Sequence, residues 1–333
     1  MTRKMWFILV MVAGVAGAGS TTPNEGSEAF AIYILEEGAL NGYRWDETPD
    51  TGWIVLPREP WLDLDDIASY DFSTHCIYLE GTTSSRYFPE TGTHFAVVAD
   101  GELCYVGSFY HISSSCMGRD PRIATPIWRG ERLTPLFDPE DVIRMGESYP
   151  IGTRAGTTAK DVRDDERVRA VLDRADKLRA GLRVTLDDVT VVDRADTTTV
   201  RYTFTVENLD ADALYVLDPE RIGTELFHYY TNGVVLWNPS ERTGSFWSSL
   251  KKTPQQPAPG TQWNHDWFTR LGSRESMTRT VILRGYPRLP AAKYTCYLIY
   301  PGAHVAKEAR RLPDGRIWFG HVRSSELTVT LAE

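Results

Sequence analysis

Short runs of apolar residues, separated by turn-forming residues, run along most of this chain. In the first half, strand-like runs occur at Phe30 to Leu35 and at His75 to Leu79, and Leu62 to Tyr70 has the pattern of a short helix. Two further β-type runs, Phe95 to Ala99 and Glu102 to Val106, flank Asp100-Gly101. That pair favours a tight hairpin turn because both residues tolerate positive φ. Together these elements predict a small α+β domain over residues 29–150.

The spacing of apolar residues changes partway along the chain and divides it into two parts. Residues 160–181 predict a charged connecting helix, with Val168, Val171 and Leu172 on one narrow apolar stripe and Gly181 as its stop. From Leu182 onward, apolar and polar residues alternate in about seven short strands, including one entered through Asn232-Gly233 as a hairpin. This alternation is typical of an antiparallel sandwich, so residues 182–333 predict an all-β sandwich domain.

The first residues predict export. Arg3 and Lys4 precede the apolar run Met5 to Ala16, and Ala16-Gly17-Ala18 supplies small residues for a signal peptidase. We therefore expect a signal peptide over residues 1–18 and a mature protein in the periplasm or outside the cell, without an integral membrane segment. Removing two positive charges changes the net charge from −9 to about −11. So acidic a chain disfavours nucleic acid as a partner.

Four cysteines lie in the exported part, and an oxidising compartment makes disulfides plausible. We predict a bridge between Cys104 and Cys116, with Cys296 as a small buried apolar side chain. The spacing of cysteines and histidines predicts neither a metal site nor a cofactor site.

The C-terminal half resembles immunoglobulin-like domains. Tyr294-Thr295-Cys296 is similar to the Tyr-x-Cys of an immunoglobulin strand F, in which the tyrosine hydroxyl bonds back to the backbone. Together with FTVENLDADALYVLDP, AAKYTCYLIYPG and RIWFGHVRSSELTVTL, it resembles a β-sandwich domain common in exported bacterial proteins. The resemblance implies the fold and the compartment but no activity.

The front half has a second likeness. LDLDDIASYDFSTHCIYLEG followed by FAVVADGELCYVGSF is similar to the periplasmic head of the Sec translocon subunit SecD. The membrane helices of that protein have no counterpart here, so this likeness implies a shared small α+β module and no translocation role.

The sequence carries few signs of catalysis. Ser113 to Ser115 lie near His111, but proximity in sequence does not supply an oriented base. Asp63, Asp65 and Asp66 fit helix capping better than calcium binding, because the glycine and closing glutamate of a calcium loop are absent. Whether the protein is an enzyme stays open at this point.

One aromatic stretch suggests binding. Between Trp237 and Trp267 the strand pattern stops for some thirty residues, and this stretch carries Phe246, Trp247, Trp263 and Trp267. Indole rings stack on sugar rings and on prolines, or they cover a sandwich edge as core residues. We therefore expect a non-catalytic module that binds a protein or a glycan at the cell envelope. The alternatives are a hydrolase with an unrecognised site in the N-terminal domain and a protein that docks on an enzyme and inhibits it.

Overall fold

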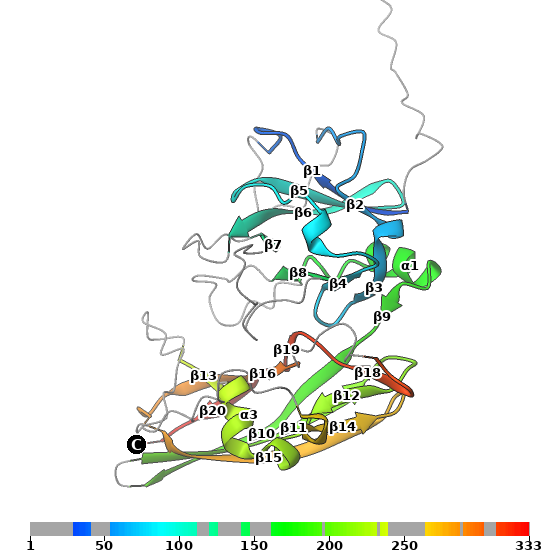
Figure 1. Cartoon of the computed structure of the whole chain (residues 1–333). Coiled ribbons are helices and arrows are strands. Elements are labelled where there is room, and N and C mark those ends of the chain that lie inside the picture. The colour runs from blue at the N-terminus through cyan, green and yellow to red at the C-terminus, as the bar shows by residue number, and fades with distance from the viewer. Residues whose placement is uncertain are drawn as a thin grey trace, which may run out of the picture.

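The computed structural model describes residues 29–40, 54–111, 120–125, 141–146, 161–194, 197–231, 234–238, 264–286, 289–302 and 311–332. These residues form a mainly β structure of several sheets with few helices, arranged as two stacked lobes (Figure 1). Each lobe has its own large hydrophobic core, one drawn from residues between Phe30 and Leu172 and the other from residues between Leu182 and Trp318.

The N-terminal lobe is built on one long sheet. Its elements are β1 (Phe30–Ile34), β2 (Leu62–Asp63), η2 (Leu64–Asp66), β3 (Ile67–Asp71), β4 (Cys76–Leu79), η3 (Thr83–Ser85), β5 (His94–Ala99), β6 (Glu102–His111), β7 (Arg122–Thr125), β8 (Val142–Gly146), α1 (Glu166–Arg174) and β9 (Leu178–Arg179). The strands follow the order β2-β1-β5-β6-β7-β8-β4-β3-β9. β2 and β3 stand near opposite ends of this order, yet only the single turn η2 separates them along the chain. The sheet therefore curls so that its two ends approach each other, and the core fills the inside.

The predicted helix over Leu62 to Tyr70 is wrong. The aspartates do cap a helical turn, since the Asp63 side chain accepts from the Asp65 and Asp66 amides and Asp66 accepts from the Asp63 amide. This turn lasts only three residues because the chain on both sides joins the sheet, β2 beside β1 and β3 beside β4. The aspartates therefore cap a helical turn, and strand pairing on both sides sets its length.

The predicted hairpin is confirmed. Asp100 and Gly101 have φ values of 51° and 76°, as the tight turn requires, and they join β5 to β6. Val97 pairs with Tyr105 and Val98 with Leu103, so Cys104 is an extra residue in a β-bulge.

A helix forms in the connecting segment, but it is shorter than predicted. The Asp165 side chain accepts from the Arg167 amide at the start of α1, and Val168, Val171 and Leu172 are buried in the core of the N-terminal lobe. The helix ends at Arg174, and Leu178–Arg179 form β9 instead of a last helical turn, because they pair in parallel with Tyr70 and Asp71 of β3.

The C-terminal lobe holds three sheets. Its elements are β10 (Leu182–Arg194), β11 (Thr197–Asn208), β12 (Leu214–Leu217), α2 (Pro219–Ile222), α3 (Thr224–Thr231), β13 (Val234–Trp237), η4 (His265–Trp267), β14 (Phe268–Leu271), β15 (Ser276–Tyr286), β16 (Lys293–Pro301), β17 (Arg311–Leu312), β18 (Gly315–Ile317), β19 (His321–Arg323) and β20 (Leu327–Thr330). The sheets have the orders β10-β11-β15, β14-β12-β18-β17 and β13-β16-β19, and β20 also pairs with β16.

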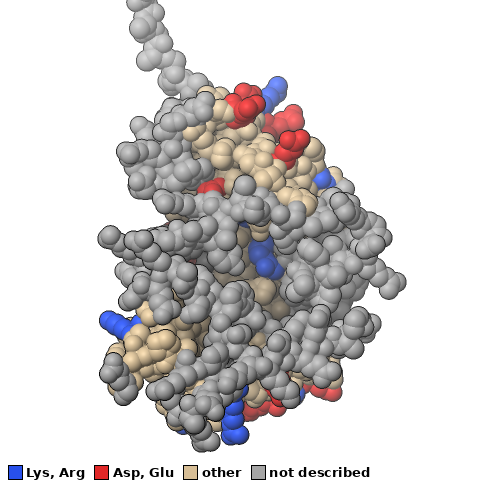
Figure 2. Space-filling model, turned by 90° about the vertical axis from the view of Figure 1, so that its left-hand side faces the viewer, with Lys and Arg blue, Asp and Glu red and all other residues tan. Residues whose placement is uncertain are grey.

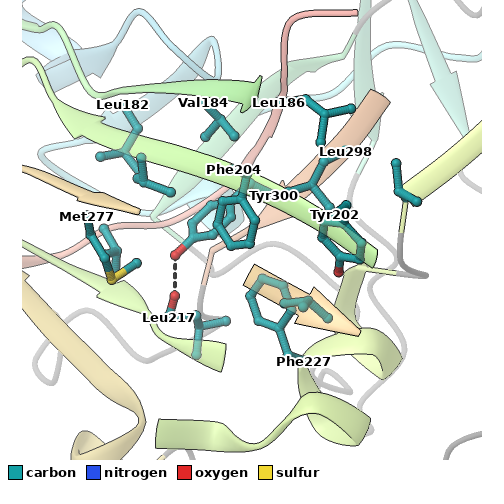
Figure 3. Packing of buried hydrophobic residues seen from close by; sticks show 14 of the residues in the cluster. Leu182, Val184, Leu186, Tyr202, Phe204, Leu217, Phe227, Met277, Leu298 and Tyr300 are labelled. Atoms are coloured by element: carbon teal, nitrogen blue, oxygen red, sulfur yellow. Dashed lines mark hydrogen bonds between the residues drawn. The ribbon is translucent and has the colours of Figure 1, made fainter. Parts of the chain in front are cut away.

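Alternating side chains of the long strands form the C-terminal core. Phe204 of β11 stacks on Phe227 of α3 with ring centroids 5.8 Å apart, and Tyr300 of β16 packs beside both rings (Figure 3). The opposite face of the β11–β15 pair carries threonines, with Thr203 bonded to Thr280 and Thr205 to Thr278, each at 2.9 Å. The strands thus have one apolar face and one polar face, as their period predicts.

The predicted hairpin through Asn232-Gly233 is wrong. The helices α2 and α3, not a strand, precede these two residues, which lie outside the described range. β13 then pairs antiparallel with β16, so its partner lies some sixty residues further along the chain.

Candidate functional site

The structure describes one of the four aromatic residues predicted to bind a ligand. Trp267 ends the short helix η4, is partly buried and packs against the C-terminal core. Phe246, Trp247 and Trp263 lie outside the described residues. The described ends of the aromatic stretch are therefore β13 on one side and η4 on the other.

A buried aspartate is bonded through its backbone to the end of the stretch at Trp267. The Asp218 amide donates to the Trp267 carbonyl at 3.0 Å, and the side chain of Asp218 is 1% exposed. That carboxylate accepts two bonds from Arg279, at 2.8 and 2.6 Å, and one from the Thr269 hydroxyl at 2.5 Å. Burial alone would raise the pKa of Asp218, but the bonds from Arg279 and Thr269 outweigh burial and lower it. We call this group the Asp218 hub.

Three polar residues precede Trp267 directly in the chain. Asn264 caps η4 by accepting from the Asp266 amide at 2.9 Å. Asn264, His265 and Asp266 are all exposed. Hydrogen-bonding groups therefore stand beside Trp267 on a turn that the Asp218 hub fixes to the core.

No disulfide joins any two of the three described cysteines. Cys76, Cys104 and Cys296 are buried, which confirms the apolar role expected of Cys296, and burial raises the pKa of the Cys104 and Cys296 thiols to about 12. Cys116 lies outside the described residues, so its pairing with Cys104 stays a prediction.

The sequence did not point to a buried polar network inside the N-terminal lobe. His75 is 4% exposed; its Nδ1 lies 3.0 Å from the Tyr70 hydroxyl and its Nε2 lies 3.5 Å from Asp164. Arg163 binds Asp161 through several bonds and also donates to the Met145 carbonyl. Burial lowers the pKa of His75 and raises that of Tyr70, so both side chains stay neutral near pH 7.

A second polar group joins the two lobes. Arg316 of β18 donates to Asp71 of the N-terminal lobe at 2.9 Å and to Asp210 of the C-terminal lobe at 2.7 Å. The Leu182 amide donates to the Ser73 hydroxyl at 3.1 Å, and Ser73 donates to Asp71 at 2.6 Å. Although burial opposes the charge on Arg316, the nearby carboxylates raise its pKa, so the guanidinium stays charged.

The motif Trp318-Phe319-Gly320 divides its side chains between the lobes. Trp318 belongs to the C-terminal core, whereas Phe319 packs with Cys76 and Val142 of the N-terminal lobe. Gly320 has φ 113°, and a Cβ there would lie 2.7 Å from Thr74. Glycine is therefore required for the close contact between the lobes.

Other surface features contribute less to a candidate functional site. A cleft of about 270 Å³ on the N-terminal lobe is lined by Glu36, Glu37, Ala39, Val55, Leu56 and Pro57. Figure 2 shows acidic side chains at the top of that lobe. Within the described ranges, no three His, Cys, Asp or Glu side chains are grouped to hold a metal ion, and no helix is long and apolar enough to span a membrane.

Sequence reasoning missed Asp71, His75, Asp218 and Arg316 because each stands in a segment that reads as an ordinary turn or strand end. The only local signal was the density of polar residues in Asp71–His75 between two strands.

His111 ends β6, and its amide donates to Thr91, whereas Ser113 to Ser115 lie outside the described residues. Comparisons with family models, with curated proteins and with solved structures found no match to this chain.

Proposed function

We propose that this is an exported, non-catalytic protein that binds a protein or a glycan at the cell envelope through the aromatic stretch between Trp237 and Trp267. The observation that carries the proposal is the Asp218 hub, which holds Trp267 at one end of the stretch. Asp218 joins the carbonyl of Trp267 to Arg279 of β15 and Thr269 of β14. The Trp267 end of the stretch is thus fixed by bonds that join three elements.

A fixed end of the aromatic stretch favours ligand binding. Ordering a flexible segment costs conformational entropy, and binding residues on rigid elements lose less when a ligand arrives. The exposed polar side chains Asn264, His265 and Asp266 stand next to Trp267. An indole with hydrogen-bonding groups beside it suits a sugar ring or a proline-containing peptide.

The charged clusters of the described residues also support a non-catalytic role. The carboxylates of Asp218, Asp71 and Asp210 each bond to an arginine and are almost fully buried. Such saturated groups hold elements together and leave little capacity to bind a reactant.

An immunoglobulin-like topology for the C-terminal lobe belongs to the same proposal. The Tyr294 hydroxyl donates to the Pro290 carbonyl at 2.9 Å, four residues upstream. This bond has the geometry of the tyrosine corner that such sandwiches use at strand F. Sandwiches of this kind carry their binding residues on long loops, which suits the aromatic stretch.

Thermal unfolding of the mature protein, residues 19–333, tests the function. A ligand that binds the native state raises the melting temperature with increasing concentration. Envelope glycans and proline-containing peptides are the probes, and one of them should raise the melting temperature. Trp247→Ala and Trp263→Ala should abolish that shift. Tyr87→Ala, which removes a 72% exposed aromatic side chain from the other lobe, is the matched control and should retain it.

Two results would contradict the proposal. One is the absence of any shift, with the tryptophan variants lowering the melting temperature of the free protein, since the indoles would then be core residues. The other is hydrolysis of an ester or glycoside probe that a single serine or acidic substitution abolishes. Export is tested separately by sequencing the secreted protein, whose first residue should be Gly19.

A further inference from the structure

The turn Asp71–His75 belongs to both lobes. On one side, its Asp71 and Ser73 accept hydrogen bonds from Arg316 and from the Leu182 amide. Thr74 contacts Gly320 closely enough that no Cβ fits between them. We call this turn, with its partners Leu182, Arg316 and Gly320, the clasp.

His75 holds the same turn from inside the N-terminal lobe. Its backbone has φ 52°, in the left-handed region, where histidine, asparagine and aspartate are enriched among the residues other than glycine. The His75 carbonyl accepts from the Met145 amide at 3.0 Å, and the ring lies 5.4 Å from that of Phe72. The backbone bond to Met145 and the buried ring therefore hold the turn from inside the N-terminal lobe.

The bonding around the ring fits a neutral imidazole. Nδ1 can accept from the Tyr70 hydroxyl at 3.0 Å, while the proton on Nε2 points toward Asp164 at 3.5 Å. The charged or titratable groups around the His75, Phe72 and Tyr70 rings come from β3, β6, the segment before α1, and α1 itself. They are Tyr70, Tyr105, Asp161, Arg163, Asp164 and Arg169.

The balance of these groups opposes protonation. Burial and then Arg163 lower the pKa of His75, while Asp164 and Asp161 act in the opposite direction without cancelling them. The pKa in the closed clasp therefore lies below the value of about 6.5 for a solvated histidine. Since an open clasp returns the ring to solvent, the closed form keeps its full stability above pH 6.5 and loses it as the pH falls through the lowered pKa.

We propose that the clasp is a pH-sensitive joint, in which protonation of His75 in mildly acidic medium releases the turn Asp71–His75 and loosens the contact between the two lobes. The joint depends on the His75 side chain, because the same five-residue turn carries both this buried imidazole and the bonds to the C-terminal lobe. It does not depend on the proposed function.

Hydrogen exchange of the Leu182 amide tests the joint, since this amide donates to Ser73 across the lobes. Its rate, corrected for the intrinsic effect of pH, should rise severalfold between pH 7.5 and pH 5.0, because the open clasp binds the proton more readily than the closed one. His75→Asn tolerates positive φ and does not titrate, so its corrected rate should be the same at both pH values. His265→Asn changes an exposed histidine of the C-terminal lobe and should respond to pH as the wild type does.

A second variant keeps the test decisive if His75→Asn fails to fold. The side chain of Asp164 is half exposed, and it raises the pKa of His75. Asp164→Asn should therefore move the midpoint of the exchange response to lower pH. The proposal fails if the corrected rate of Leu182 is the same at both pH values in the wild type. The proposal is also overturned by an unchanged midpoint in Asp164→Asn or by a full pH response in His75→Asn.

Discussion

Asp218 stands before Pro219 in what reads as an ordinary helix cap, and it does accept from the Glu220 amide at 3.0 Å. The structure adds Arg279 and Thr269 as partners. Removing Asp218 would leave Arg279 with only the exposed Glu220, 3.3 Å away, and losing one member of a buried ion pair costs more than the pair contributes.

Asp218→Ala should accordingly lower the free energy of unfolding by about 3 kcal/mol, because Arg279 loses its buried partner. Urea unfolding at pH 7 measures this. Glu207→Ala breaks the exposed pair with Arg183 and is the control, with little change expected. Equal effects of the two substitutions would show that the Asp218 hub does not stabilise the lobe.

His228 gives the C-terminal core its own pH dependence. It is 5% exposed on α3, and burial lowers its pKa to about 4, against about 6.5 in the unfolded chain. Its contribution to stability is therefore constant above pH 6.5 and falls as the pH drops from 6.5 to 4. Over that window, His228→Leu should lose less stability than the wild type, by on the order of 3 kcal/mol in urea unfolding. Parallel pH curves for the two proteins would contradict this.

At the scale of elements, the Asp100-Gly101 hairpin was predictable because its signal is local. Gly101 has φ 76°, so Gly101→Ala should destabilise the protein by about 1 kcal/mol. Gly146→Ala is the matched control in β8, since a Cβ there lies 3.8 Å from its nearest neighbour, the Arg122 carbonyl. Chemical denaturation compares the two variants. A loss at Gly146 as large as that at Gly101 would mean that backbone conformation is not the cause.

Elements that depend on distant partners could not be predicted in the same way. Leu62 to Tyr70 has helical spacing, but β1 and β4 draw its two ends into the sheet. β13 follows a turn signal, yet its partner is β16. The sandwich-like alternation from Leu182 was readable, whereas the order of the strands follows from pairings that no local pattern encodes.

The candidate site likewise contains residues that a local pattern reveals and residues that only the fold brings together. Trp267 was found because aromatic residues are conspicuous in a sequence. Asp218, whose amide bonds to Trp267, and its partner Arg279 are separated by some sixty residues and meet only through the fold. The clasp likewise unites Asp71 with Arg316, which are 245 residues apart in the chain.

For the whole molecule, the contact between the lobes should make them unfold together. Phe319 is fully buried against Cys76 and Val142 of the other lobe, so Phe319→Ala should remove about 3 kcal/mol of coupling. In calorimetry we expect one transition for the wild type and two for this variant, because each lobe keeps its own core. Phe227→Ala deletes an equally buried ring inside the C-terminal core and leaves the contact between the lobes intact. It should lower the melting temperature while keeping a single transition, and two transitions in the wild type would refute the coupling.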